Sequence, residues 1–230
     1  MLNTKRMRFP IDVILVCIRW YAAYPLSYRH LEEMMQERGV VVDHSSINRW
    51  AIRFLPLLEK VFRNHKLGVG KSWRMDETYI KVKGAWKYLY RAVDKEGKTV
   101  DFLLTANRDA SAARRFFAKA MQQNEVPETV TMDKSGANKA ALDQLNTQRE
   151  IPIKIRQVKY LNNIVEQDHR AVKRVTRPML GFKSFRSAQA VLAGIELIHM
   201  IRKGQFMMEG RDGMPFADQF YMLAGQVRPT

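Results

Sequence analysis

Residues 73–105 read WRMDETYIKVKGAWKYLYRAVDKEGKTVDFLLT, and their pattern decides the fold class. Three segments rich in β-branched and aromatic residues are predicted to form strands: residues 73–82, 86–93 and 99–105. Lys83-Gly84 and a connection ending at Gly97 separate them, and glycine permits the positive φ that hairpin turns require. The stretch therefore predicts a meander of three antiparallel strands.

The segments that follow alternate between helix and strand patterns. The expected elements are a helix over 111–123, a strand over 129–132, a helix over 138–148, a strand over 153–158, and helices over 163–175 and 187–202. Three strands followed by this alternation indicate an α/β fold with a mixed sheet flanked by helices. This is the element order of the RNase H-like fold.

Residues 11–63 carry the pattern of a small all-α domain. Apolar spacing predicts one helix over 11–23 and a second helix that ends at Gly39. A third helix begins after Asp43 or Ser45, either of which is a suitable N-cap. The residues expected on its inward face are Ile47, Trp50, Ala51 and Phe54.

The start of this third helix has the composition of a DNA-reading element. Short polar and basic side chains there are typical of the recognition helix of a helix-turn-helix, which enters the major groove. The alternative is an ordinary helical bundle with a basic, solvated face. The candidate DNA contacts are Ser45 and the outward-facing Ser46, Asn48, Arg49 and Arg53.

These patterns divide the chain into two domains joined by a linker. The expected division is a helix-turn-helix region over 1–63, a linker over 64–72, the RNase H-like domain over 73–204, and a tail over 205–230 to which the pattern assigns no element.

The charge balance indicates a polyanionic partner. The chain has 39 Lys and Arg against 23 Asp and Glu, which gives a net charge of +16. Nucleic acid is the usual reason for such an excess, because basic side chains displace the counterions condensed on phosphates. A basic protein with another role is the alternative that charge alone leaves open.

Cys17 is the only cysteine and cannot form an internal disulfide. We expect it to be a buried helical residue in a protein of the reducing cytoplasm. No signal peptide is expected, and no segment approaches the roughly 20 apolar residues needed to cross a bilayer.

Three acids are candidates for one metal-binding cluster. Asp76 lies in the first strand, Asp133 directly follows the fourth, and Glu166 lies near the start of the next helix. If the first and fourth strands are neighbours, these carboxylates gather at one edge of the sheet. Because they repel one another, they require divalent cations such as Mg²⁺ or Mn²⁺, and a pair of such ions supports phosphoryl transfer. Taken singly, each acid has an ordinary surface or capping role as its alternative.

Neighbouring charges are sorted by the geometry of strand and helix. Glu77 is expected to point to the opposite face from Asp76, and Asp168 to lie on another side of the helix from Glu166. Arg170 follows Glu166 by one helical turn, on the same face, where it can meet a phosphate.

Long segments of this chain resemble one protein family. They are SYRHLEEMMQERGVVVDHSSINRW (27–50), MDETYIKVKGAWKYLYRAVDKEGKTVDFLLT (75–105), KYLNNIVEQDHRAVKR (159–174) and GFKSF (181–185). In this order they resemble the bacterial insertion-sequence transposases of family six, within the DDE superfamily. The resemblance runs from about residue 11 to residue 204.

The resemblance implies an enzyme that cuts the 3′ ends of a mobile element and joins the freed hydroxyls to target DNA, typically producing cointegrates by replicative transposition. It implies a helix-turn-helix that binds terminal inverted repeats, two divalent metals, at least a dimer, and a bacterial protein of the cytoplasm and nucleoid. The family's acids fall on Asp76, Asp133 and Glu166, and its basic residue seven positions further falls on Lys173. Lys159, Arg170, Lys173 and Arg174 lie in a strongly basic segment expected to line the DNA.

The interval between Asp133 and Glu166 departs from the family pattern. It holds 32 residues, two fewer than the family usually has. A shortening in the loop around 147–152 would leave the site intact. A different strand register, which would move Glu166 out of the site, is the alternative.

Two other functions are weighed against a transposase. A DNA-binding regulator derived from an inactive transposase would need none of the three acids, which are all present. A general RNase H-like nuclease would need no sequence-reading module, which the amino-terminal helices resemble.

Overall fold

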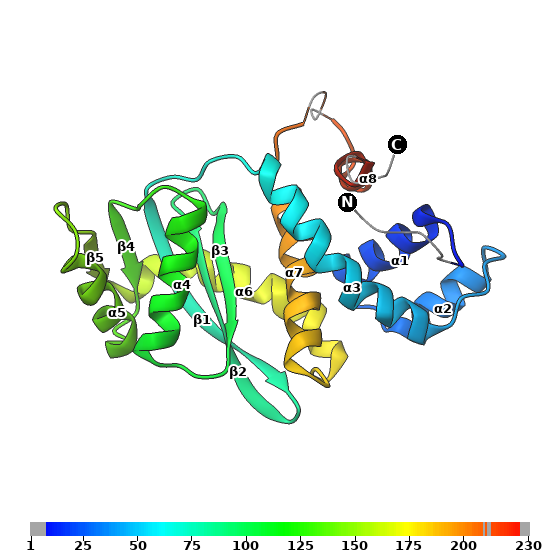
Figure 1. Ribbon diagram of the computed structural model, residues 1–230, viewed down its shortest axis with the longest axis horizontal. Helices are drawn as coiled ribbons and strands as arrows, with labels where there is room; N and C mark the ends of the chain where they lie inside the picture. Colours follow the sequence, from blue (N-terminus) through cyan, green and yellow to red (C-terminus); the bar gives the residue numbers. More distant parts are fainter. Residues whose placement is uncertain (1–7, 209, 211–212, 226–230) are drawn as a thin grey trace. The chain divides into compact units, whose positions relative to one another are not determined.

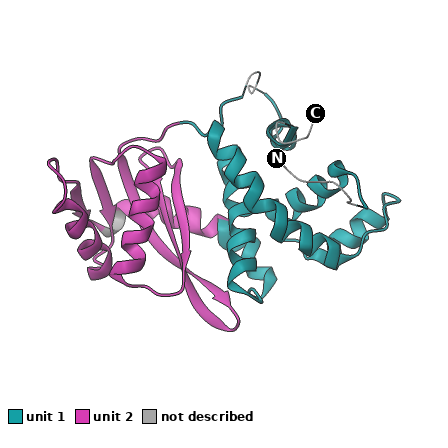
Figure 2. Cartoon of the chain, viewed as in Figure 1, with its two compact units in different colours: residues 1–67, 172–230 teal, residues 68–171 magenta. Residues whose placement is uncertain are grey.

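The computed structural model describes residues 8–208, 210 and 213–225, apart from the side chains of Lys159 and Tyr160. The chain forms two compact units, residues 68–171 and residues 1–67 with 172–230 (Figure 2). The expected division had instead placed all of 73–204 in one domain. The difference arises because helix α7 (Phe185–Arg202) packs with the amino-terminal helices.

Unit 2 contains one five-stranded mixed sheet (Figure 1). Its strand order is β3-β2-β1-β4-β5, with β1, β2 and β3 antiparallel and with β4 and β5 parallel to β1. The strands are β1 (Ser72–Val82), β2 (Ala85–Asp94), β3 (Thr99–Thr105), β4 (Thr129–Met132) and β5 (Lys154–Gln157). The predicted meander and the predicted mixed sheet flanked by helices are both confirmed.

The turns of the meander have the backbone that the sequence predicts. Lys83 and Gly84 have φ of 49° and 78°, and Gly97 has φ of 83°. Glycine adopts these left-handed conformations without steric cost, so the two hairpins close tightly.

One face of the sheet carries the hydrophobic core of unit 2. Helices α4 (Ala110–Gln123) and α5 (Gly136–Asn146) cover this face (Figure 1). Alternate strand residues such as Met75 and Tyr90 pack against them, and Tyr90 stacks on Phe116 with ring centroids 5.8 Å apart. The other face carries Asp76 and its β2 neighbour Arg91.

Unit 1 is all helical and has its own core. Its main helices are α1 (Ile11–Ala23), α2 (Tyr28–Gln36), α3 (His44–Phe62), α7 (Phe185–Arg202) and α8 (Phe216–Gly225). Helix α7 is buried without interruption from Ala190 to Ile198, because α1, α3 and α8 all pack against it. Gly194 lies so close to α3 that an added Cβ would meet a Leu55 methyl group at 2.6 Å.

The residues after 204 contribute to this core, although the sequence pattern assigned them no element. Phe206 is buried, and its backbone forms an isolated antiparallel β-bridge with Lys66. Phe220 of α8 is fully buried, with its ring centroid 6.0 Å from that of Phe62. Cys17 is buried in α1 as expected, and burial raises the pKa of its thiol to about 12.

Candidate active site

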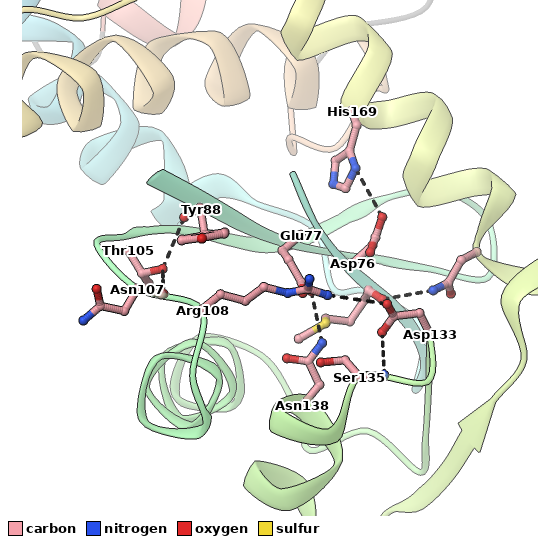
Figure 3. Close-up of polar contacts among 12 residues, drawn as sticks. Asp76, Glu77, Tyr88, Thr105, Asn107, Arg108, Asp133, Ser135, Asn138 and His169 are labelled. Atoms are coloured by element: carbon pink, nitrogen blue, oxygen red, sulfur yellow. Dashed lines mark hydrogen bonds and ion pairs between the residues drawn. The ribbon is translucent and has the colours of Figure 1, made fainter. Parts of the chain in front are cut away.

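Asp76 lies in the middle of β1 and faces the side of the sheet away from α4 and α5. Its neighbours Met75 and Glu77 face the opposite side, where Met75 joins the core and Glu77 meets Asn138 of α5. The Asp76 side chain is 20% exposed, and its Oδ2 lies 3.5 Å from His169 Nδ1 (Figure 3). The predicted alternation of Asp76 and Glu77 is therefore observed.

Asp133 comes directly after β4, as expected. The parallel register sets Arg74 of β1 opposite Thr131 of β4, so two residues further along Asp76 comes beside Asp133. Asp133 Oδ1 accepts a hydrogen bond of 3.0 Å from the Ser135 backbone N–H, and its side chain is 37% exposed. The first and fourth strands are thus neighbours, as the three-acid cluster requires.

Glu166 lies in the first turn of helix α6 (Asn163–Thr176) and is partly buried. Its charge acts on Asp76. Burial raises the pKa of Asp76 to about 7, and the negative charges of Glu77, Asp133 and Glu166 add to this effect. Asp76 therefore lies within reach of the charges of Asp133 and Glu166.

Buried polar contacts hold the first part of α6 and the turn before it on the sheet. Arg91, the β2 neighbour of Asp76, is fully buried, and its Nη2 lies 3.2 Å from Asp168 Oδ2. The Asn162 amide donates a 3.2 Å hydrogen bond to the carbonyl of Met75. Asp168 thus points to Arg91, which agrees with its exclusion from the acid cluster.

Arg108 and Asn138 belong to the site although no sequence pattern singled them out. Arg108 forms an ion pair with Glu77 through Nε, and its Nη2 lies 3.6 Å from Asp133 Oδ2 (Figure 3). Asn138 donates a 3.0 Å hydrogen bond to the second oxygen of Glu77. The partners are distant in sequence, so only the fold brings them together.

The chemistry of the three acids fits a divalent cation. Carboxylate oxygens are the ligands of hard cations, and a cation would offset both the burial and the repulsion that raise the pKa of Asp76. In the described residues no three acid, histidine or cysteine side chains converge on one point as they stand. Asp76 and Asp133 are turned toward the basic groups of His169 and Arg108, while the parallel register of β1 and β4 already places the two acids beside each other.

Comparison with known proteins decides the family. The model DDE_Tnp_IS240, described as a DDE domain, matches residues 70–205. The transposase for insertion sequence-like element IS431mec of Staphylococcus aureus is 39% identical over 198 residues, which cover 85% of this chain and 87% of that protein. The transposase for insertion sequence element IS257 in transposon Tn4003, also from Staphylococcus aureus, has the same identity and coverage.

The chain belongs to family six of the bacterial insertion-sequence transposases. It is accordingly an enzyme of DNA strand cleavage and transfer. Solved structures show more distant similarity. The catalytic core domain of BIV integrase is 15% identical with a TM-score of 0.42, covering 69% of this chain and 98% of that one. The HTLV-2 integrase catalytic core domain in complex with magnesium is 14% identical with a TM-score of 0.40, covering 69% and 84%.

The start of α3 in the transposase has a well-formed N-cap. Asp43 accepts hydrogen bonds from the backbone N–H groups of Ser45 and Ser46, at 2.9 and 3.0 Å. Ser46 was expected to face outward, but it is buried, because its hydroxyl bonds Asp43 at 2.7 Å and accepts from Arg49 at 2.8 Å. Ser45, Arg49 and Arg53 are exposed and Asn48 is partly exposed.

The basic residues of the transposase after β5 are mostly accessible. Arg170 and Arg174 are exposed and Lys173 is partly exposed. Lys173 lies in the last turn of α6, two helical turns after Glu166. The side chain of Lys159 lies outside the described residues.

The shortened interval of the transposase is closed by one local contact. Helix α5 ends at Asn146, whose side chain accepts from Ile153 N–H at 2.8 Å and donates to Ile153 C=O at 3.0 Å. Strand β5 then pairs with β4 over its full length. No helix in the described part of the transposase is both long and apolar enough to span a membrane.

Proposed function

We propose that this transposase cuts the 3′ ends of its insertion sequence and transfers them to target DNA at a site formed by Asp76, Asp133 and Glu166. One observation carries the proposal: the parallel register of β1 and β4 brings Asp76 beside Asp133, and His169 of α6, three residues after Glu166, contacts Asp76. The three acids would hold two divalent cations, Mg²⁺ or Mn²⁺. When bound, such a pair of cations activates the attacking oxygen and stabilises the leaving oxygen of a phosphoryl transfer.

The remaining polar groups of the site hold and orient the acids. The Ser135 N–H fixes one oxygen of Asp133, and His169 contacts Asp76. The Arg91–Asp168 pair holds α6 and with it Glu166. Arg170 and Lys173, four and seven positions beyond Glu166, would bind the DNA phosphates beside the acids.

Unit 1 would supply the sequence reader. Helices α1, α2 and α3 form a helix-turn-helix for the terminal inverted repeats, with Ser45, Asn48, Arg49 and Arg53 as DNA contacts. Ser46 would act through Asp43 and Arg49, because its own hydroxyl is engaged by them. Lys159 and Arg174 would contact the DNA backbone, and the net charge of +16 favours this binding.

The full cycle would follow the family. Strand transfer without excision of the whole element would give a cointegrate by replicative transposition. Two element ends must be brought together, so the active form would be a dimer or a higher multimer. The protein would act in the bacterial cytoplasm, at the nucleoid.

The test is strand transfer by the purified protein on DNA that carries both element ends, with Mg²⁺ or Mn²⁺. Asp76→Asn and Asp133→Asn should abolish joining and leave binding to the ends intact. Asp143→Asn is the matched control, because Asp143 is half exposed on α5 and pairs with Lys139 one helical turn away. Joining by both active-site variants would refute the proposal, and hydrolysis without joining would favour a nuclease.

A further inference from the structure

The Glu77 side chain is an acid in the wall of the site that the proposed chemistry does not use. It is 3% exposed and faces α5, on the opposite side of β1 from Asp76. A buried carboxylate requires a partner, because desolvation of its charge is costly. Arg108 provides the counter-charge, and Asn138 donates to its second oxygen.

Arg108 is consequently fixed rather than freely moving. Its Nε is bound to Glu77, which orients the planar guanidinium, while the side chain as a whole remains 37% exposed. The end of the guanidinium that Glu77 does not bind lies toward the active site, with Nη2 3.6 Å from Asp133 Oδ2 (Figure 3). Asp133 itself is held on its other oxygen by Ser135 N–H.

We propose that Arg108, anchored by Glu77, is a positioning residue that serves as the built-in counter-ion of Asp133. This inference rests on the proposed role of Asp133 as a metal ligand. Arg108 orients the Asp133 carboxylate at the edge of the sheet and offsets part of its charge. A divalent cation at Asp133 therefore competes with a fixed guanidinium, and Arg108 lowers the metal affinity of the site.

The direction in which metal affinity changes on loss of Arg108 distinguishes a counter-ion from a purely structural contact. Loss of an ordinary structural contact loosens the site and weakens metal binding. Loss of a counter-ion leaves the acids with more net negative charge, so metal binding becomes tighter. Arg108→Gln removes the charge and keeps a shorter side chain that can still donate a hydrogen bond.

The experiment measures Mn²⁺ binding to the full-length protein without DNA, by electron paramagnetic resonance of the free ion. We expect Arg108→Gln to lower the Kd for Mn²⁺ by about three- to tenfold, while its thermal midpoint falls. Arg115→Gln, on the exposed side of α4, is the control and should leave the Kd unchanged. An unchanged or higher Kd for Arg108→Gln would overturn the inference.

Two further variants keep the test decisive. If Arg108→Gln does not fold because Glu77 is left without its partner, Glu77→Gln with Arg108→Gln removes both charges together. This double variant leaves the net charge beside Asp133 unchanged, so its Kd for Mn²⁺ should stay near that of the wild type, and clearly weaker binding would contradict the inference. Asp133→Asn tests the underlying function: if it binds Mn²⁺ as the wild type does, Asp133 is no ligand and both proposals fail. If Asp133→Asn loses binding but Arg108→Gln matches the wild type, only this inference fails.

Discussion

Arg91 Nη2 lies 3.2 Å from Asp168 Oδ2, and this ion pair ties helix α6 to strand β2 at the level of the active site. Arg91 is fully buried and lies opposite Asp76 in the sheet register, while Asp168 follows Glu166 by two residues. The position of Glu166 relative to Asp76 therefore depends on a buried charge pair that lies outside the acid cluster.

Breaking this pair on one side should destabilise unit 2. Arg91→Met leaves Asp168 buried without its cation, and we expect a loss of about 3–5 kcal/mol of unfolding free energy. Arg91→Met with Asp168→Leu should recover most of that loss, because both charges are removed. The unfolding free energy of each variant is measured by urea denaturation, with amide hydrogen exchange in residues 68–171 as the readout for unit 2. Equal losses in the single and double variants would contradict the account.

The N-cap of α3 should make the stability of unit 1 depend on pH. Side-chain hydrogen bonds from Ser45 and Ser46 hold the pKa of Asp43 below its ordinary value. A carboxyl with a lowered folded-state pKa contributes stability above its unfolded pKa of about 4 and loses it as pH falls further.

Asp43→Asn keeps a good N-cap but removes this titration. Its thermal midpoint should therefore fall less than that of the wild type between pH 5 and pH 3, values chosen to span the ordinary pKa of about 4. Asp43→Ala should be less stable than both at neutral pH. Parallel pH profiles of wild type and Asp43→Asn would show that the cap charge has no such role.

Lys173 and Arg174 should separate chemistry from DNA affinity, although they are neighbours on α6. Lys173→Gln should lower the rate of strand transfer by about 10²-fold, because it removes a cation expected beside the reacting phosphate. Arg174→Gln should mainly weaken DNA binding and reduce the slope of log affinity against log salt by about 1. Rates and salt-dependent binding measured on the same DNA test this, and similar effects of both variants would contradict it.

The sequence predicted the parts of the fold that depend on local pattern. The period of two and the turn glycines determine the meander, and the strand before Asp133 is short, buried and clearly bounded. The sequence predicted helix α7 at its observed place in the chain, but it did not predict that α7 packs against α1, α3 and α8. It is apolar around most of its circumference, so its pattern does not say which surface buries it.

The supporting contacts of the site could not be found in this way. Arg108 lies in the loop before α4, where no periodicity applies, and its partner Glu77 is distant in sequence. The Arg91–Asp168 pair joins a strand to a helix across the sheet face and depends on tertiary packing alone. Sequence pattern predicts the acids, whereas the groups that contact them appear only once the chain is folded.

Glu166 is the acid on which the proposed three-acid site depends most, because the shortened interval lies directly before it. The decisive measurement is strand transfer by Glu166→Gln with Mn²⁺, beside Glu150→Gln as a control on the exposed loop of that same interval. We predict that Glu166→Gln binds the element ends normally but joins DNA at least about 10³-fold more slowly, while Glu150→Gln remains active. Joining by Glu166→Gln at the wild-type rate would contradict the three-acid site.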